Sequence, residues 1–127
     1  MESFEIKMVT VDGVGVVNTT PHPITFGVGD EIVSVPTSVL VNAKATETLA
    51  RTEDGVEFVK TVFEGTPEGE EVISKILQEC PEAVIVGSIV AAQAYPGKVF
   101  GMTPLPGYER VAPAEKRMNP HKFTTFE

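Results

Sequence analysis

The sequence predicts an α+β fold, a mostly antiparallel sheet with two helices on one face, in a single domain over residues 1–127. Asp-Gly pairs at positions 12–13 and 54–55 each separate two β-prone runs. Such a pair is a strong hairpin signal, because both central residues of a type I′ turn need positive φ. Helix start signals precede two later segments, at about 66–80 and 88–95. A chain of 127 residues fits one compact core.

The first half of the chain is dominated by predicted strands. The two predicted hairpins account for the first strands and for the run at 56–63, and two further short strands are expected at 24–28 and 31–35. Residues 39–51 have no clear period, so helix and edge strand both remain open there. The sheet is therefore expected to form mostly from short, locally connected strands.

The helix predicted at 66–80 has the clearest boundaries in the chain. Thr66 and Pro67 stand in the order expected of an N-cap followed by the first helical residue. Acidic residues fall in the first turn, where they suit the positive end of the helix dipole. Apolar side chains recur at helical spacing at Val72, Ile73, Ile76, Leu77 and Cys80. One apolar face should therefore pack on the sheet.

A strand, a turn and a short helix are expected between residues 83 and 95. An apolar run at 83–86 predicts a buried strand, Gly87 a turn, and Ser88 the N-cap of an alanine-rich helix. This unit is the best place on the chain for a ligand. One more strand is expected at 98–102. The C-terminal tail after it contains four prolines and one glycine, and it is predicted to be irregular and draped over the body or a neighbouring subunit.

Composition and charge narrow the classes of partner. A net charge of −8 and a pI near 4.7 argue against binding to bulk nucleic acid, which requires clustered Lys and Arg. A small anionic ligand needs only one or two arginines and some backbone amides, so it stays possible. The sequence has no apolar run long enough to span a membrane and no signal-peptide pattern, so we expect a cytoplasmic protein with no membrane partner. The single Cys80 is expected to be a reduced thiol.

No catalytic constellation is recognisable, so we expect no enzyme, no catalytic residue, no metal and no cofactor. Ser88 follows a strand, but the glycines of a G-x-S-x-G elbow are missing around it. His22 and His121 have no acidic partners at the spacing that zinc ligands show. The glycines form neither a phosphate loop nor a dinucleotide fingerprint.

The most unusual polar cluster is Asn18-Thr19-Thr20-Pro21-His22, between two predicted strands. It contains an amide, two hydroxyls and an imidazole, which suit a ligand-binding loop. A purely structural role, in which Asn and Thr side chains satisfy local backbone groups, is the alternative.

At this cluster the chain resembles small, mostly phage-encoded proteins that carry an N-[LT]-T-P-H motif. Those proteins also have an apolar strand with a serine leading into an alanine-rich helix, as residues 84–92 do here. It resembles more distantly the anti-defence proteins that counter Thoeris-type systems by sequestering cyclic nucleotide signals. Those proteins carry an arginine and aspartate pair after the helix, where this chain has residues 95–98. The resemblance implies a viral, nucleotide-binding homo-oligomer that acts in the host cytoplasm.

The leading functional hypothesis is therefore a non-enzymatic phage protein that binds and sequesters a small, anionic, nucleotide-like immune signal. The candidate ligand-binding residues are Asn18, Thr20, His22, Ser88 and Arg110. The polar groups would hydrogen-bond the ligand, the imidazole would orient it, and the guanidinium would neutralise phosphate. Two alternatives are a structural or assembly protein that binds another protein, and a small hydrolase that uses His22 with a carboxylate.

Overall fold

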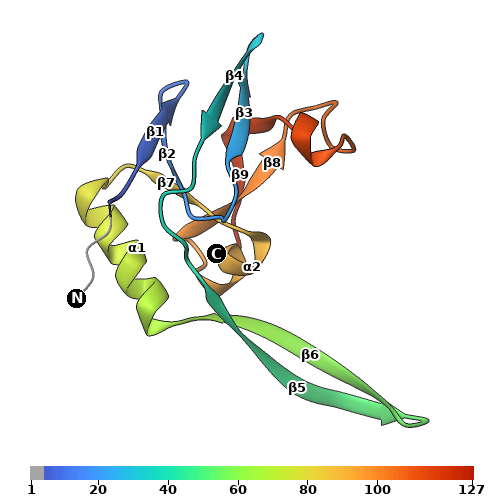
Figure 1. The fold of residues 1–127 in the computed structure, drawn as a ribbon. Helices are drawn as coiled ribbons and strands as arrows, with labels where there is room; N and C mark the ends of the chain where they lie inside the picture. Colours follow the sequence, from blue (N-terminus) through green and yellow to red (C-terminus); the bar gives the residue numbers. More distant parts are fainter. Residues whose placement is uncertain (1–4) are drawn as a thin grey trace.

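The computed structural model describes residues 5–127, which form a body of sheet and helices with a long hairpin protruding from it (Figure 1). The elements, in chain order, are β1 (Met8–Val11), β2 (Val14–Asn18), β3 (Ile24–Val28), β4 (Glu31–Val35), β5 (Ala43–Glu53), β6 (Val56–Gly65), α1 (Pro67–Glu79), β7 (Val84–Val86), α2 (Ile89–Ala94), β8 (Val99–Pro104), a 3-10 turn η1 (Pro113–Glu115) and β9 (Met118–Thr124). The described chain is thus a small α+β structure rich in strands.

Seven of the strands form one sheet in the order β1-β2-β7-β8-β9-β3-β4. Antiparallel pairing joins β1 to β2, β8 to β9, and β3 to β4. Parallel pairing joins β2 to β7, β7 to β8, and β3 to β9. The sheet is therefore mixed: more of its residue pairs are antiparallel than parallel, and the parallel pairs are a feature that the sequence prediction did not contain.

The parallel pairing arises from connections that the local sequence pattern did not reveal. Residues 87–98, which include α2, carry the chain from the end of β7 back to the start of β8, and a parallel connection needs about a dozen residues of this kind. The strand, turn and helix expected at 83–95 are all present. Together with β8 they form a βαβ unit in the middle of the sheet.

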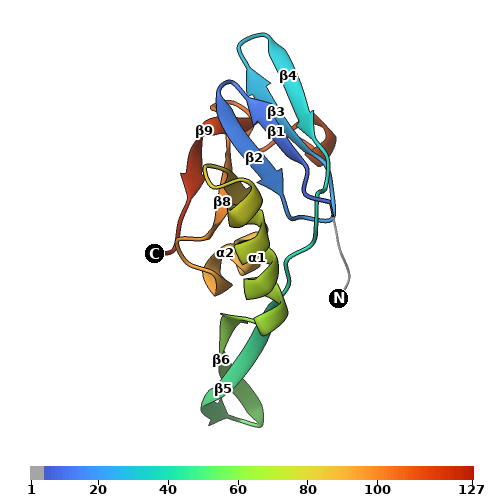
Figure 2. The ribbon, with the colours of Figure 1, turned by 90° about the vertical axis from the view of Figure 1, so that its left-hand side faces the viewer.

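The sheet curls until its two ends approach each other, so that it is nearly closed (Figure 2). A parallel bridge pairs Asn18, at the end of β2, with Thr37, just beyond β4. The backbone amide of Ser38 also donates a hydrogen bond of 2.8 Å to the Asn18 carbonyl oxygen. The segment that follows β4 therefore closes the gap that the strand order leaves open.

Alternation along the strands separates two hydrophobic clusters. Inside the curled sheet lie Val11, Val16, Ile24, Phe26, Val35 and Val86. On the outer face Val17, Ile85 and Val99 pack against Ile73 and Ile76 of α1 and Ala91 and Tyr95 at α2. Neighbouring residues of β2 and β7 thus point to opposite faces, as the period of two requires.

Both predicted helices are confirmed, and they pack on the same outer face of the sheet. Thr66 caps α1 and Ser88 caps α2, each through its side-chain oxygen. No helix within residues 5–127 has the length and apolar content needed to cross a bilayer. The segment left open at 39–51 forms most of β5.

The C-terminal tail corrects one prediction, because it is not irregular throughout. Strand β8 runs on to Pro104, and β9 fills the sheet between β8 and β3. Met102 pairs with Phe123 and Pro104 with Met118, so two steps along β8 correspond to five along β9. This bulge in β9 accommodates Pro120, which has no backbone donor for a regular ladder. Irregular backbone is confined mainly to 105–117 and the last residues.

Strands β5 and β6 form a separate two-stranded sheet that extends away from the body (Figures 1 and 2). We call residues 43–65 the arm. Ten residues of β6 at about 3.3 Å each give it a length of about 33 Å. Asp54 and Gly55 at its tip have φ values of 50° and 79°, as the predicted turn requires.

The cap of α1 gives a direct test of the helix start. The Thr66 hydroxyl oxygen accepts a 3.0 Å hydrogen bond from the Gly69 amide. We expect Thr66→Ala to lower the free energy of unfolding by about 1 kcal/mol, measured by denaturant titration. Ser74→Ala, at an exposed position within the same helix, serves as the control and should not destabilise the protein. Equal midpoints for wild type and Thr66→Ala would contradict the capping role.

Candidate functional site

The predicted polar loop at 18–23 is organised by the Asn18 side chain, which is 0% exposed. Its Nδ2 donates to the carbonyl oxygens of His22 at 2.8 Å and Val35 at 3.0 Å. Its Oδ1 accepts from the backbone amide and the hydroxyl of Thr20, at 2.8 and 2.7 Å. Both amide hydrogens and the carbonyl oxygen are thus engaged within the protein.

Two threonines that the sequence prediction did not select complete this arrangement. The hydroxyl of Thr19 and its backbone amide both donate to the Val86 carbonyl oxygen, at 2.7 and 2.9 Å. The Thr37 hydroxyl donates to the Thr20 carbonyl oxygen at 2.8 Å. Nothing in the sequence distinguishes a threonine that bonds to the backbone from one that could bind a ligand. The roles of Thr19 and Thr37 are therefore seen only in the folded chain.

The two motifs that carried the sequence resemblance meet in the structure. Asn18 ends β2 and Val86 ends β7, and these residues pair in the parallel register. Gly87 follows, and a Cβ there would lie 2.7 Å from Val99 Cγ1 and 3.2 Å from Thr19 Oγ1. A residue without a side chain is therefore required where the two motifs touch.

Of the five candidate ligand residues, the structure brings four into this region and leaves one apart. Thr20 is half-buried, whereas His22 and Ser88 are exposed. The Ser88 hydroxyl oxygen accepts a 3.1 Å hydrogen bond from the Ala91 amide. Arg110 lies in the segment after β8 and makes no hydrogen bond or ion pair within residues 5–127.

Another arginine on the same segment has an aromatic neighbour. The Arg117 guanidinium carbon lies 5.9 Å from the centre of the Tyr108 ring. Both side chains border a hollow of about 260 Å³ beside the turn between β3 and β4, which also exposes Asp30 and Glu31. The lining thus combines one cationic side chain with two carboxylates, so it favours neither an anionic nor a cationic ligand.

The two histidine side chains lie apart, and only that of His121 has a hydrogen-bond partner within the part of the chain that the structure describes. His121 Nε2 lies 2.9 Å from Asp12 Oδ2 at the β1–β2 turn, which ties that hairpin to β9. Neither histidine hydrogen-bonds to Ser88 in the part of the chain that the structure describes. No group of three metal-binding side chains occurs in that part either.

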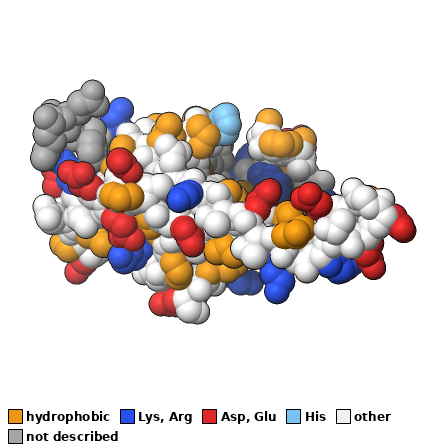
Figure 3. All heavy atoms as spheres, turned by 90° about the horizontal axis from the view of Figure 1, so that it is seen from below, with side chains coloured by type: hydrophobic (Ala, Val, Ile, Leu, Met, Phe, Trp, Pro, Cys, Tyr) orange, Lys and Arg blue, Asp and Glu red, His pale blue; other side chains and the backbone are white. Residues whose placement is uncertain are grey.

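The arm is the most exposed element of the structure. Large apolar side chains stand in water along it: Leu49 is 57% exposed, Val56 54% and Val62 53%, with Phe58 and Val59 also exposed. Figure 3 shows such side chains among charged ones on the part that extends to the right. Arg51 covers the Phe58 ring at 4.3 Å and pairs with Glu53 at 3.1 Å.

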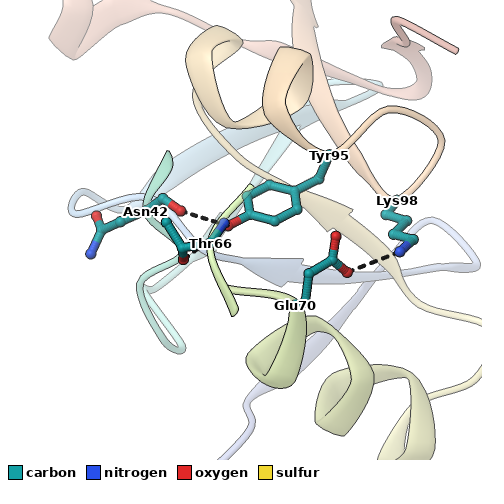
Figure 4. A network of polar contacts seen from close by, with 5 residues as sticks. All are labelled: Asn42, Thr66, Glu70, Tyr95 and Lys98. Atoms are coloured by element: carbon teal, nitrogen blue, oxygen red, sulfur yellow. Dashed lines mark hydrogen bonds and ion pairs between the residues drawn. The ribbon is translucent and has the colours of Figure 1, made fainter. Parts of the chain in front are cut away.

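Tyr95, at the C-terminal end of α2, holds both roots of the arm (Figure 4). Its hydroxyl donates to the Asn42 carbonyl oxygen, just before β5, at 2.7 Å. It also accepts from the Thr66 amide, just after β6, at 2.9 Å. The Lys98–Glu70 ion pair, at 2.9 Å, joins α1 to the turn after α2 nearby. The arm therefore leaves the body from a fixed base.

Two glycines make room for this tyrosine. A Cβ at Gly65 would lie 2.5 Å from the Tyr95 ring, and a Cβ at Gly69 would overlap the hydroxyl. Gly69 is the one signal that sequence reasoning could have used, because a glycine in the first turns of a helix often marks a close approach.

Comparison of the chain with protein-family models, with curated proteins and with solved structures finds no match.

The Asn18 network yields a contrast between two neighbouring candidate residues. Asn18→Ala removes four hydrogen bonds and leaves the Val35 carbonyl oxygen without this donor. We expect a loss of about 1–3 kcal/mol in the free energy of unfolding, measured by denaturant titration. His22→Ala should change it by less than about 0.5 kcal/mol, because that side chain is exposed and only its backbone joins the network. Similar losses in the two variants would refute this division of roles.

Proposed function

We propose that this is a non-enzymatic interaction and assembly protein that acts in the cytoplasm through its arm. The observation that carries the proposal is a two-stranded sheet with exposed apolar side chains on both strands and no third strand against it within residues 5–127. An isolated two-stranded hairpin is marginally stable in water, and a third strand or another packed surface stabilises it. A bound partner would supply that surface.

The base of the arm supports the same function. The Tyr95 hydroxyl links the segments before β5 and after β6, so the arm need not be oriented when a partner binds. Orienting a binding element beforehand reduces the entropy lost on association. The exposed Phe58 and Val59 offer apolar contact area of the kind found at the centre of interfaces.

This proposal is tested by placing a photo-crosslinking amino acid on the arm. We expect Phe58→p-benzoylphenylalanine and Val59→p-benzoylphenylalanine to give covalent adducts when cells that produce the protein are irradiated, because these side chains would touch the partner. Ser74, exposed on α1, is the matched control position and should give none. Gel electrophoresis and mass spectrometry detect the adducts. Absence of any adduct from the arm positions would refute the proposal.

We propose, as a second function, that the protein binds and sequesters a small anionic, nucleotide-like immune signal of a phage-infected host. The supporting observation is that β2 and β7 are parallel neighbours whose carboxyl ends meet at Asn18 and Val86. In α/β folds with closed or open sheets, ligands commonly bind beside the carboxyl ends of parallel strands. Exposed His22 and Ser88 would contact the ligand there, and Arg110 of another subunit in a homo-oligomer would neutralise phosphate.

A retention assay tests this second function. The purified protein is incubated with cyclic nucleotides and cyclic ADP-ribose isomers, washed, heat-denatured, and the released molecules are analysed by chromatography. We expect intact ligand from wild type, and loss of retention in His22→Ala and Arg110→Ala but not in Lys122→Ala, an exposed control on β9. A cleaved product would instead favour a hydrolase. Failure to retain any compound would remove the nucleotide hypothesis and leave the arm proposal intact.

A further inference from the structure

The two outer edges of the arm differ in their capacity to pair with another strand. Strand β5 has a register irregularity between Leu49 and Arg51, and bulges of this kind impede pairing at an edge. On β6, by contrast, every residue from Val56 to Gly65 has a partner on β5, so this strand has no bulge. Between Val56 and Glu64, β6 contains no proline or glycine, and it is rich in valine and phenylalanine. Its outer edge is therefore the better template for a further strand.

We propose that residues 59–65 of β6 pair antiparallel with the same residues of a second copy of this chain, which joins the two arms in a four-stranded sheet along that overlap. This inference rests on the proposed function of the arm and names its partner. A second copy presents the same unpaired edge, and a two-fold axis satisfies both edges at once. Four strands also exceed the number at which a sheet becomes stable by itself.

The charges on β6 select one register for this pairing. A two-fold axis perpendicular to the sheet keeps the same face of both strands on the same side of the combined sheet. Residues that lie directly opposite each other across the axis must therefore have side chains on the same face. With the axis at Val62, Lys60 lies opposite Glu64 of the partner subunit, and the same contact occurs twice. An axis at Lys60 would place two like charges together. Among the positions within β6, only the axis at Val62 pairs opposite charges.

Within the arm Glu64 already lies opposite Lys44, whereas Lys60 lies opposite an uncharged residue. Val62 lies opposite Thr46 and Lys60 opposite Thr48 on β5, so all of them share one face. Val62 is 53% exposed and at the centre of the proposed contact. A second β6 strand would cover this valine and give Lys60 a charged neighbour, which its own cross-strand threonine does not supply.

A charge-reversal series tests the partner and the register. By sedimentation equilibrium at micromolar concentrations, we expect wild type to show a mass twice 13.6 kDa. Lys60→Glu should weaken the dimer roughly tenfold, because two attractive contacts become repulsive. Adding Glu64→Lys should restore the dimer, since the reversed charges again lie opposite each other. Lys122→Glu, the same change on the body, should have no effect, and circular dichroism checks that each variant is folded.

A cysteine pair in the Cys80→Ser background tests the axis independently of charge. Val62→Cys should form an intermolecular disulfide under mild oxidation, because the axis brings the two copies of position 62 together. Val56→Cys, whose native side chain is 54% exposed, is the matched control and should remain a monomer on non-reducing gels. Equal cross-linking at both positions would refute the register.

The outcomes separate this inference from the function on which it rests. A dimer that is insensitive to Lys60→Glu, or that fails to cross-link at position 62, overturns β6 pairing. A monomeric wild type whose arm photo-crosslinks only to a different protein overturns the second copy as partner, but leaves the arm as the interaction element. A chain without photo-adducts and without self-association refutes both.

Discussion

The carboxamide of Asn18 holds the nearly closed sheet together. One side chain fixes the turn after β2 through Thr20 and His22, and bonds to the end of β4 through the Val35 carbonyl oxygen. The strand order alone places β2 and β4 near opposite ends of the sheet. A buried amide with complete hydrogen bonding is specific for one geometry, because any other geometry leaves polar groups unpaired in the interior. Asn18 thus joins the end of β2 to the end of β4, together with the Ser38 amide and the Thr37 hydroxyl.

Tyr95 has the corresponding role outside the sheet. Its ring packs in the cluster shared with both helices, and its hydroxyl binds the backbone on either side of the arm. A short series of elements connects β2 to the arm. Strand β2 pairs with β7, β7 is followed by α2, and Tyr95 caps the C-terminal end of α2. The arm is therefore oriented relative to the loop at 18–23 through rigid elements. If both proposed functions hold, the association of arms fixes where the two candidate ligand loops lie.

The sequence predicted the elements better than their arrangement. The caps at Thr66 and Ser88 and the turns at Asp12 and Asp54 were correct, because each depends on a few adjacent side chains and on backbone angles that those residues favour. The parallel pairing and the entry of β9 into the sheet depend on contacts between distant residues, which local patterns do not encode. Among the candidate site residues, Asn18 was selected for its unusual context, and the structure gives it a buried bonding network. The role of Tyr95 was not predicted, because its hydrogen bonds to both roots of the arm join segments that are distant in the sequence.

The charges of the arm explain how a long unpaired edge is tolerated. An exposed apolar strand pairs indiscriminately unless charged residues interrupt it, and Glu57, Lys60 and Glu64 interrupt β6. The chain has a net charge of −8, and Lys60 is a positive charge among exposed valines. In the proposed dimer, Lys60 would favour the register in which it lies opposite Glu64 of the partner subunit. The same residues would then prevent aggregation and select the register. This dual effect requires a rigid base, since a mobile arm would sample other registers, and Tyr95 supplies that base by bonding to both roots.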